Sequence, residues 1–76
     1  MSFTPRELVA LTNELRRFAF KLCKNRDDAE NLLHTTVLRA LEKRHMFEAG
    51  TDLFGWTSKM MFNLFVTQYR RKAREP

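Results

Sequence analysis

The sequence predicts an all-α fold, a compact bundle of three main helices with a short loop before the long third helix. Apolar residues recur at helical spacing in three segments, and short polar breaks divide these segments. No stretch alternates apolar and polar residues as a strand would. With 76 residues, the range 1–76 is expected to form one domain, close to the lower size limit for an unaided hydrophobic core.

The composition is that of a basic globular protein. Hydrophobic residues make up 43% of the chain, charged residues make up 30%, and the net charge is +5. A small basic domain favours a polyanionic partner, most often nucleic acid. Cys23 is the single cysteine, so no internal disulfide can form, and a reducing cytoplasmic location is expected. The sequence has no signal-peptide pattern and no segment of membrane-spanning length, so no membrane association is expected.

The first helix is predicted to start after Thr4 and to end near Cys23. Thr4 can cap it, Pro5 suits the first helical position, and Glu7 completes a capping box. One side then carries apolar residues at helical spacing, namely Leu8, Leu11, Leu15, Phe18, Ala19 and Leu22.

The second helix is predicted to start at a cap provided by Asn25 or Asp27 and to end at Lys43 and Arg44. Its acidic first turn and basic last turn both complement the helix dipole. Its core stripe is Ala29, Leu32, Leu33, Thr36, Val37, Ala40 and Leu41. The residues outside that stripe are Asn31, His34, Thr35, Leu38, Arg39 and Glu42, and the apolar Leu38 among them leaves room for a partner.

The third helix, from Asp52 to Arg74, is apolar on more than one side. Gly50 in the preceding loop is predicted to adopt a positive φ, and Thr51 or Asp52 is predicted to cap the helix. At about 100° per residue, a plausible core face consists of Leu53, Trp56, Thr57, Met60, Leu64 and Thr67. A second stripe, Phe54, Phe62, Phe65 and Tyr69, lies nearly opposite and needs its own cover, either within the fold or from a partner.

No catalytic or cofactor-binding pattern is present. The chain lacks a phosphate-cradling glycine loop, an HExxH motif and paired cysteines. His34 and His45 have no neighbouring cysteine or aspartate at ligand spacing, so no metal site is expected. We therefore expect a protein that is not an enzyme and that uses no cofactor and no small-molecule substrate.

From about Leu15 to Arg74, the chain resembles the region-two domain of bacterial sigma factors of the extracytoplasmic-function type. The resemblance depends on the order and separation of several segments, none of which is specific alone. These segments are Leu15–Ala19, Asp28–Leu32 with Thr36–Ala40, Phe47–Leu53 with Trp56, and Asn63–Arg71. The Phe-x-x-Gly-Thr loop further resembles the alphaproteobacterial general-stress subgroup. A full factor of this family would add a second helical domain that reads the minus-thirty-five element, and nothing in this sequence supplies it.

The resemblance implies three roles. The exposed side of the second helix would dock on the clamp coiled coil of the largest RNA polymerase subunit. The loop would hold a base flipped from the minus-ten promoter element, and the third helix would guide the opened non-template strand. An anti-sigma factor is a further expected partner. The polymerase-binding candidates are Asn31, His34, Thr35, Leu38, Arg39 and Glu42. The DNA-binding candidates are Phe47, Gly50, Thr51, Asp52, Leu53, Lys59, Phe62, Asn63, Val66, Arg70, Arg71, Lys72 and Arg74.

The chemistry of the residues agrees with these roles. Reading bases in an opened strand requires apolar or aromatic surfaces for stacking beside cations that follow the phosphates. Capturing a flipped base requires a short loop whose backbone groups meet the base edge, and Gly50 with Thr51 can form one. Stacking contributes about 1–3 kcal/mol per base, enough to help hold a melted strand without ATP hydrolysis.

The chain departs from the family mainly on the polymerase side. Family members commonly have Asp, Gln and Glu at the positions of Asn31, His34 and Thr35, so the acidic character of the second helix is diluted here. Thr57 and Thr67 replace a frequent leucine and a frequent aspartate. The promoter-side match is therefore better than the polymerase-side match.

Two other hypotheses remain open. The domain could be a sigma-like protein-binding module that acts mainly through an anti-sigma partner, whose helix could cover the surplus apolar surface. Alternatively, it could be a duplex-binding helix-turn-helix domain that places its third helix in a major groove. Preference for duplex over single strand would favour the second of these hypotheses.

Overall fold

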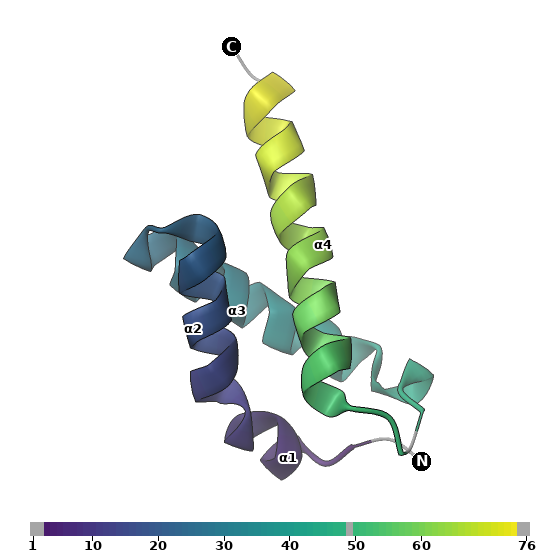
Figure 1. Ribbon diagram of the computed structural model, residues 1–76. Helices are drawn as coiled ribbons and strands as arrows, with labels where there is room; N and C mark the ends of the chain where they lie inside the picture. The colour runs from purple at the N-terminus through teal and green to yellow at the C-terminus, as the bar shows by residue number, and fades with distance from the viewer. Residues whose placement is uncertain (1–2, 49, 75–76) are drawn as a thin grey trace.

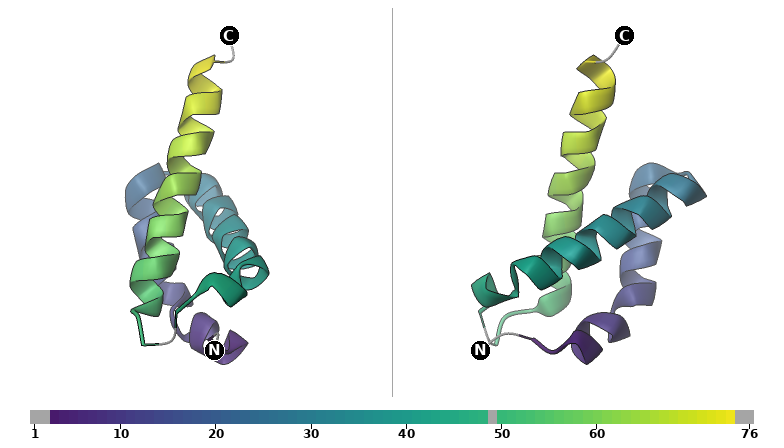
Figure 2. Two further views of the ribbon diagram at one scale, coloured as in Figure 1. Left: turned by 90° about the vertical axis from the view of Figure 1, so that its right-hand side faces the viewer. Right: turned by 180° about the vertical axis from the view of Figure 1, so that it is seen from behind.

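The computed structural model describes residues 3–48 and 50–74, with side chains described as far as Arg71, and confirms the all-α fold. Its elements are α1 (Pro5–Ala10), α2 (Thr12–Cys23), α3 (Arg26–Glu42), the 3₁₀ turn η1 (Arg44–Met46) and α4 (Leu53–Arg74). The part of the chain described here contains no strand. In Figure 1, α4 stands against α2 and α3, and the C-terminal half of α4 projects beyond them. The views in Figure 2 show the same projection, which makes the domain elongated, with extents of 44 × 21 × 16 Å.

The predicted first helix is wrong in one respect, because it is divided into α1 and α2 at Leu11. Leu11 lies outside regular helical geometry, with φ −93° and ψ −4°. Its N–H donates to the carbonyl of Leu8, three residues back, at 3.0 Å. The side chain of Thr12 also donates to that carbonyl, at 3.5 Å. The break is therefore a local change in the backbone hydrogen bonding at Leu11, which helical periodicity does not reveal.

The starts of α1 and α3 follow the predicted caps. The Thr4 hydroxyl accepts from the N–H of Glu7 at 3.2 Å, and the Glu7 carboxylate accepts from the N–H of Thr4 at 3.1 Å. The Asn25 side chain accepts from the N–H of Asp28 at 3.0 Å, so Asn25 rather than Asp27 caps α3. Gly50 has the predicted positive φ, +92°. These ends were predictable because capping involves residues close together in sequence.

The core lies where α2, α3 and α4 meet. Its fully buried side chains include Leu15 of α2, Leu32 and Thr36 of α3, and Thr57 and Met61 of α4. The hydroxyls of the two threonines donate to carbonyls one turn back, Thr36 to Leu32 at 2.7 Å and Thr57 to Leu53 at 2.8 Å. A buried hydroxyl without a partner would be costly, and these bonds remove that cost.

The predicted core face of α4 needs correction, because the helix is turned about its axis relative to that prediction. Met61 was outside the predicted stripe, yet it is fully buried. Thr67 was inside the stripe but is exposed, and Met60 is only half-buried. The cause is that α4 contacts both α2 and α3, so its buried side faces the junction of two helices. Within the second aromatic stripe, Phe54 and Phe65 pack against the core, whereas Phe62 and Tyr69 remain exposed.

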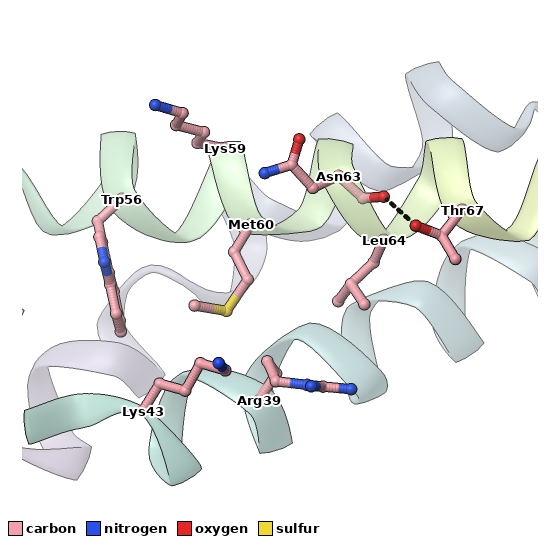
Figure 3. Close-up of a pocket in the computed structure, with 8 residues that line it drawn as sticks. All are labelled: Arg39, Lys43, Trp56, Lys59, Met60, Asn63, Leu64 and Thr67. Atoms are coloured by element: carbon pink, nitrogen blue, oxygen red, sulfur yellow. Dashed lines mark hydrogen bonds between the residues drawn. The ribbon is translucent and has the colours of Figure 1, made fainter. Parts of the chain in front are cut away.

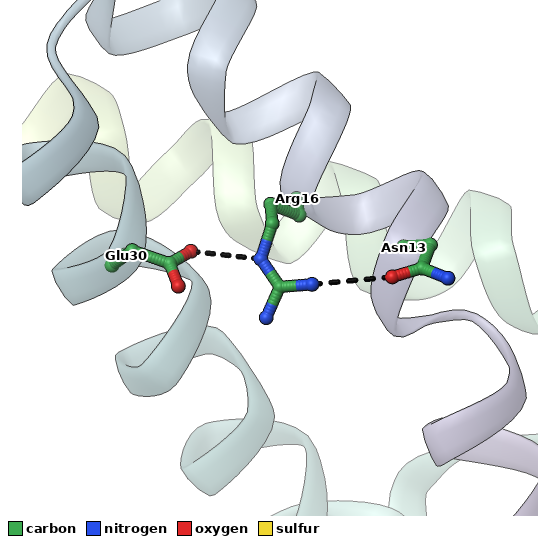
Figure 4. Close-up of polar contacts among 3 residues, drawn as sticks. All are labelled: Asn13, Arg16 and Glu30. Atoms are coloured by element: carbon green, nitrogen blue, oxygen red, sulfur yellow. Dashed lines mark hydrogen bonds and ion pairs between the residues drawn. The ribbon is translucent and has the colours of Figure 1, made fainter.

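An ion pair joins the outer surfaces of α2 and α3 (Figure 4). The Arg16 Nε donates to the Glu30 carboxylate at 2.9 Å, and its Nη1 donates to the Asn13 side-chain oxygen at 3.2 Å. Both charged side chains are about half exposed, at 47% and 49%. Solvent screening limits such a pair to about 0–1 kcal/mol, so apolar packing contributes most of the contact between these helices.

The rotation of α4 can be tested with its two adjacent methionines. We expect Met61→Ala to reduce the free energy of unfolding by about 2–5 kcal/mol, because it leaves a cavity in the core. We expect the matched variant Met60→Ala to cost only about 1 kcal/mol, because Met60 is half-buried. Urea denaturation followed by circular dichroism measures both values. A larger loss for Met60→Ala than for Met61→Ala would contradict the observed helix orientation.

Candidate nucleic-acid interface

A groove runs between the C-terminal end of α3 and the first four turns of α4 (Figure 3). We call it the α3–α4 groove; its volume is about 470 Å³. Its lining residues are Arg39, Lys43, Trp56, Lys59, Met60, Asn63, Leu64 and Thr67. On α4 these residues recur at i, i+3, i+4, i+7, i+8 and i+11, which places them on one stripe of the helix.

The groove combines an apolar floor with cationic walls. Trp56, Met60 and Leu64 extend from α4 towards α3, whereas Lys59 and Asn63 lie along the outer rim. Arg39 and Lys43 supply positive charge from the α3 side. The described lining contains three cationic side chains and no carboxylate. Such a surface can stack or pack against flat apolar groups and attract anions at the same time.

Residue spacing places Asn63 at the rim with its side chain accessible. The Asn63 backbone carbonyl accepts a hydrogen bond at 3.0 Å from the hydroxyl of Thr67, one turn further along α4. This bond occupies the Thr67 hydroxyl on the groove side. The Asn63 side-chain amide projects away from the floor beside Lys59. An exposed amide can both donate and accept a hydrogen bond, as recognition of a base edge requires.

The loop before α4 is held by a tight turn. The N–H of Thr51 donates to the carbonyl of Glu48 at 3.2 Å, and the Thr51 hydroxyl donates to the same carbonyl at 2.6 Å. Gly50, the third residue of this turn, has a φ of +92°, which side-chain-bearing residues rarely adopt. The turn therefore favours glycine at position 50, and it holds both the N–H and the hydroxyl of Thr51 on the Glu48 carbonyl.

A second hollow, which we call the loop pocket, continues from the α3–α4 groove. It is lined by Met46, Glu48, Thr51, Asp52, Gly55, Trp56 and Lys59, with a volume of about 380 Å³. Trp56 and Lys59 line both hollows. The two hollows are therefore neighbours on the surface of α4.

Three aromatic rings form a cluster beneath the loop, which we call the aromatic cluster. It consists of Phe3, Phe47 and Trp56, with ring centroids 5.3 to 5.7 Å apart. Phe47 is 9% exposed, so its ring faces inward and anchors the loop. Phe3 was not among the residues predicted from the sequence. An available signal was its place just before the cap Thr4, where an apolar residue often packs against the residue at the position of Leu8. Both Phe3 and Leu8 are 2% exposed.

The structure gathers some of the predicted DNA-binding residues and separates others. Lys59 and Asn63 line the groove, and Gly50, Thr51 and Asp52 lie at or beside the loop pocket. Leu53 is half-buried in the first turn of α4. Outside the groove lie the exposed Phe62, the half-buried Val66, the exposed Arg70, and Arg71, which lines a hollow with Cys23 and Asn31. The side chains of Lys72 and Arg74 lie outside the described residues.

The predicted polymerase-binding residues share one broad face of α3, and all of them except the half-buried Thr35 are exposed. His34, Leu38 and Glu42 are exposed, and Leu38 is 49% exposed. Arg39 instead lines the α3–α4 groove, and Asn31 lies in the hollow shared with Arg71. The half-buried Thr35 donates its hydroxyl to the Asn31 carbonyl at 2.9 Å. His34, Leu38 and Glu42 line neither the groove nor that hollow, and we call these three residues the outward strip of α3.

Among the described residues, no group of three or more His, Cys, Asp or Glu side chains is placed to hold a metal ion. None of the helices described is long and apolar enough to cross a membrane.

Comparison with known proteins gives the family. Residues 9–75 match the family model for sigma-70 region 2. The chain belongs to the sigma-70 region 2 family. It is 38% identical over 69 residues to the ECF RNA polymerase sigma factor EcfG of Rhodopseudomonas palustris (strain TIE-1), a match that covers 91% of this chain and 38% of that protein. It is 32% identical over 62 residues to the RNA polymerase sigma factor HrpL of Pseudomonas syringae pv. syringae, covering 82% of this chain and 34% of HrpL.

A solved structure agrees with this sigma-70 region 2 assignment. The chain superimposes with a TM-score of 0.87 and 35% identity on the sigma factor RpoE of Bartonella quintana, solved in complex with the anti-sigma factor NepR. The match covers 91% of this chain and 43% of the RpoE chain. The chain thus spans less than half the length of each of these relatives.

Proposed function

We propose that this chain recognises and helps open the minus-ten promoter element while docked on RNA polymerase, as the region-two domain of a sigma factor. One observation carries the proposal. The α3–α4 groove has an apolar floor and three cations, and it continues into the loop pocket through Trp56 and Lys59. An opened strand needs this combination, because its phosphates seek cations while its unstacked bases seek apolar surfaces and a place for a flipped base.

The proposed mechanism uses binding energy alone. Bases of the non-template strand pack along Trp56, Met60 and Leu64, and the phosphates follow Arg39, Lys43 and Lys59. One base leaves the stack and enters the loop pocket, where the Thr51 and Asp52 region meets its edge. Each stacked base contributes about 1–3 kcal/mol, which shifts the equilibrium towards the melted state. The domain thus acts without catalytic groups or a cofactor, and it works in the cytoplasm with RNA polymerase.

The polymerase contact is proposed for the outward strip of α3. His34, Leu38 and Glu42 are exposed there, and the opposite side of α3 is buried against α2 and α4. None of these three residues lines the groove, although Leu38 and Glu42 directly precede the groove residues Arg39 and Lys43. Exposed apolar residues such as Leu38 are suitable anchors for a helix of a partner protein.

A second candidate function is sequestration by an anti-sigma factor. RpoE of Bartonella quintana was solved bound to NepR. In the present chain, Phe62 and Tyr69 of α4 are 47% and 66% exposed, which leaves apolar surface for an amphipathic helix. Binding of this kind is compatible with promoter recognition, since one partner could replace the other. Sequestration by an anti-sigma factor would be the main function if the groove showed no preference among nucleic acids.

The sequence preference of the groove can be tested with Asn63→Ala. Fluorescence anisotropy compares a single-stranded minus-ten non-template oligonucleotide with a scrambled strand and with duplex across a salt series. We expect the original chain to prefer the minus-ten strand. We expect Asn63→Ala to lose about 1–3 kcal/mol of this discrimination, the range for a specific base contact.

Gln68→Ala, which removes an exposed amide of the same helix outside the groove, is the matched control. Equal binding of all three nucleic acids by the original chain would reject the proposal.

The cationic walls can be tested with Arg39→Gln and Lys43→Gln. Each is expected to weaken binding to all single strands alike and to reduce the slope of log K against log salt by about 0.7, the value for one phosphate contact. Arg17→Gln makes the same charge change on the outer side of α2 and should leave the slope nearly unchanged. If all three variants behaved alike, net charge rather than the groove would explain the binding.

The polymerase contact can be tested with Leu38→Asp. We expect at least about tenfold weaker binding to the isolated clamp coiled coil, because the variant places a charge where apolar surface would be buried. Val9→Asp makes a similar change at a residue of α1 that is 70% exposed, and it should bind normally. Biolayer interferometry gives both affinities. Unaltered binding of Leu38→Asp would remove this strip from the interface.

A further inference from the structure

The chain segment before α1 is tied to the loop that precedes α4. Phe3 lies 44 positions before Phe47, yet their rings meet edge to face with centroids 5.6 Å apart. The Phe3 ring also lies 5.7 Å from that of Trp56. It is only 2% exposed, although it belongs to no helix. Phe3 therefore fills the space between the loop and the first turns of α4.

A polar contact fixes the same segment. The Arg44 Nη2 donates to the Phe3 carbonyl at 3.3 Å, and the guanidinium carbon lies 6.0 Å from the centre of the Phe3 ring. Arg44 is the first residue of η1, which leads directly into the loop. Arg44 and Phe47, at the N-terminal end of the loop, therefore both contact Phe3.

The loop has few other attachments of this kind. Glu48, Gly50 and Thr51 are exposed, and the described hydrogen bonds of this turn are internal to it. Phe47 is the buried side chain at the start of this turn, and Phe3 covers its ring. Trp56, on the far side of the loop, lines the loop pocket and contacts both phenylalanines. The position of the pocket wall therefore depends on the packing of the aromatic cluster.

We propose that Phe3 is a positioning residue for base selection, which holds the loop and Trp56 in the arrangement that admits a particular flipped base. This inference rests on the proposed promoter-recognition function and deepens it. Phe3 lies beneath the pocket and touches no nucleic acid itself. Its effect should fall on discrimination between bases, because the proposed phosphate-binding cations Arg39, Lys43 and Lys59 take no part in the ring contacts of this cluster.

The test compares Phe3→Ala with Val9→Ala, a control substitution at an exposed residue of α1. Anisotropy is measured with a set of minus-ten strands that differ at one base each, and with a scrambled strand. For Phe3→Ala we expect the preference for the captured base to fall by about fivefold to tenfold, as expected for losing aromatic contacts. We expect affinity for the scrambled strand and the salt slope to stay unchanged. A merely destabilised domain would lose both kinds of binding together.

Three further measurements separate positioning from stability. Trp56 is the single tryptophan of the chain, so its fluorescence reports the aromatic cluster directly, and Phe3→Ala should shift its emission to longer wavelength. Phe3→Leu keeps apolar volume and should restore part of the selectivity. Arg44→Gln removes the donor to the Phe3 carbonyl without altering the rings, and it should reduce selectivity in the same direction. It thus provides the test if Phe3→Ala does not fold.

The outcomes distinguish this inference from the function on which it depends. If the original chain shows no base preference, the promoter-recognition proposal fails. If the original chain selects a base and both Phe3→Ala and Arg44→Gln retain that selection, promoter recognition stands and the positioning role of Phe3 is overturned. A parallel loss of selectivity and of scrambled-strand binding in folded variants would also overturn it.

Discussion

The orientation of α4 about its own axis is the constraint on which the rest of the structure depends. Thr57 and Met61 are fully buried where α4 meets both α2 and α3. With those residues inside, helical geometry directs Trp56, Met60 and Leu64 towards the end of α3 and leaves Lys59 and Asn63 along the rim. The packing of the core and the shape of the candidate interface are therefore two consequences of one arrangement.

The same orientation explains how so small a domain can offer separate surfaces. The groove lies on one side of α4, the exposed Phe62 and Tyr69 lie on another, and the residues of the outward strip of α3 do not line the groove. Each surface has its own chemistry, namely cationic with an apolar floor, aromatic, and mixed around Leu38. A helix bundle allows this division because each helix buries one stripe and leaves the remaining sides for partners. The proposed DNA, polymerase and anti-sigma contacts can thus be altered independently.

Local interactions determine the conformation of the loop, whereas long-range contacts determine its position in the domain. Its turn is local, since Gly50 and the two bonds to the Glu48 carbonyl determine its conformation. Its placement is long-range, since the aromatic cluster joins Phe3, Phe47 and Trp56 from three parts of the chain. Prediction from sequence identified Gly50, Thr51, Lys59 and Asn63 as candidate site residues. It assigned Arg39 to the polymerase side and did not identify Phe3, because neither a groove between two helices nor a contact across 44 positions leaves a periodic pattern.

The sequence by itself determined the elements and most of their ends. The capping box at Thr4 and Glu7, the Asn25 cap and the positive φ of Gly50 all involve interactions within a few residues, so short patterns reveal them. Only the tertiary structure decided the break at Leu11, the burial of Met61 in place of Met60 and the inward direction of Phe47. The physical reason is that α4 carries apolar residues on several sides. Periodicity cannot choose among them, and the choice falls to the side that packs best against α2 and α3.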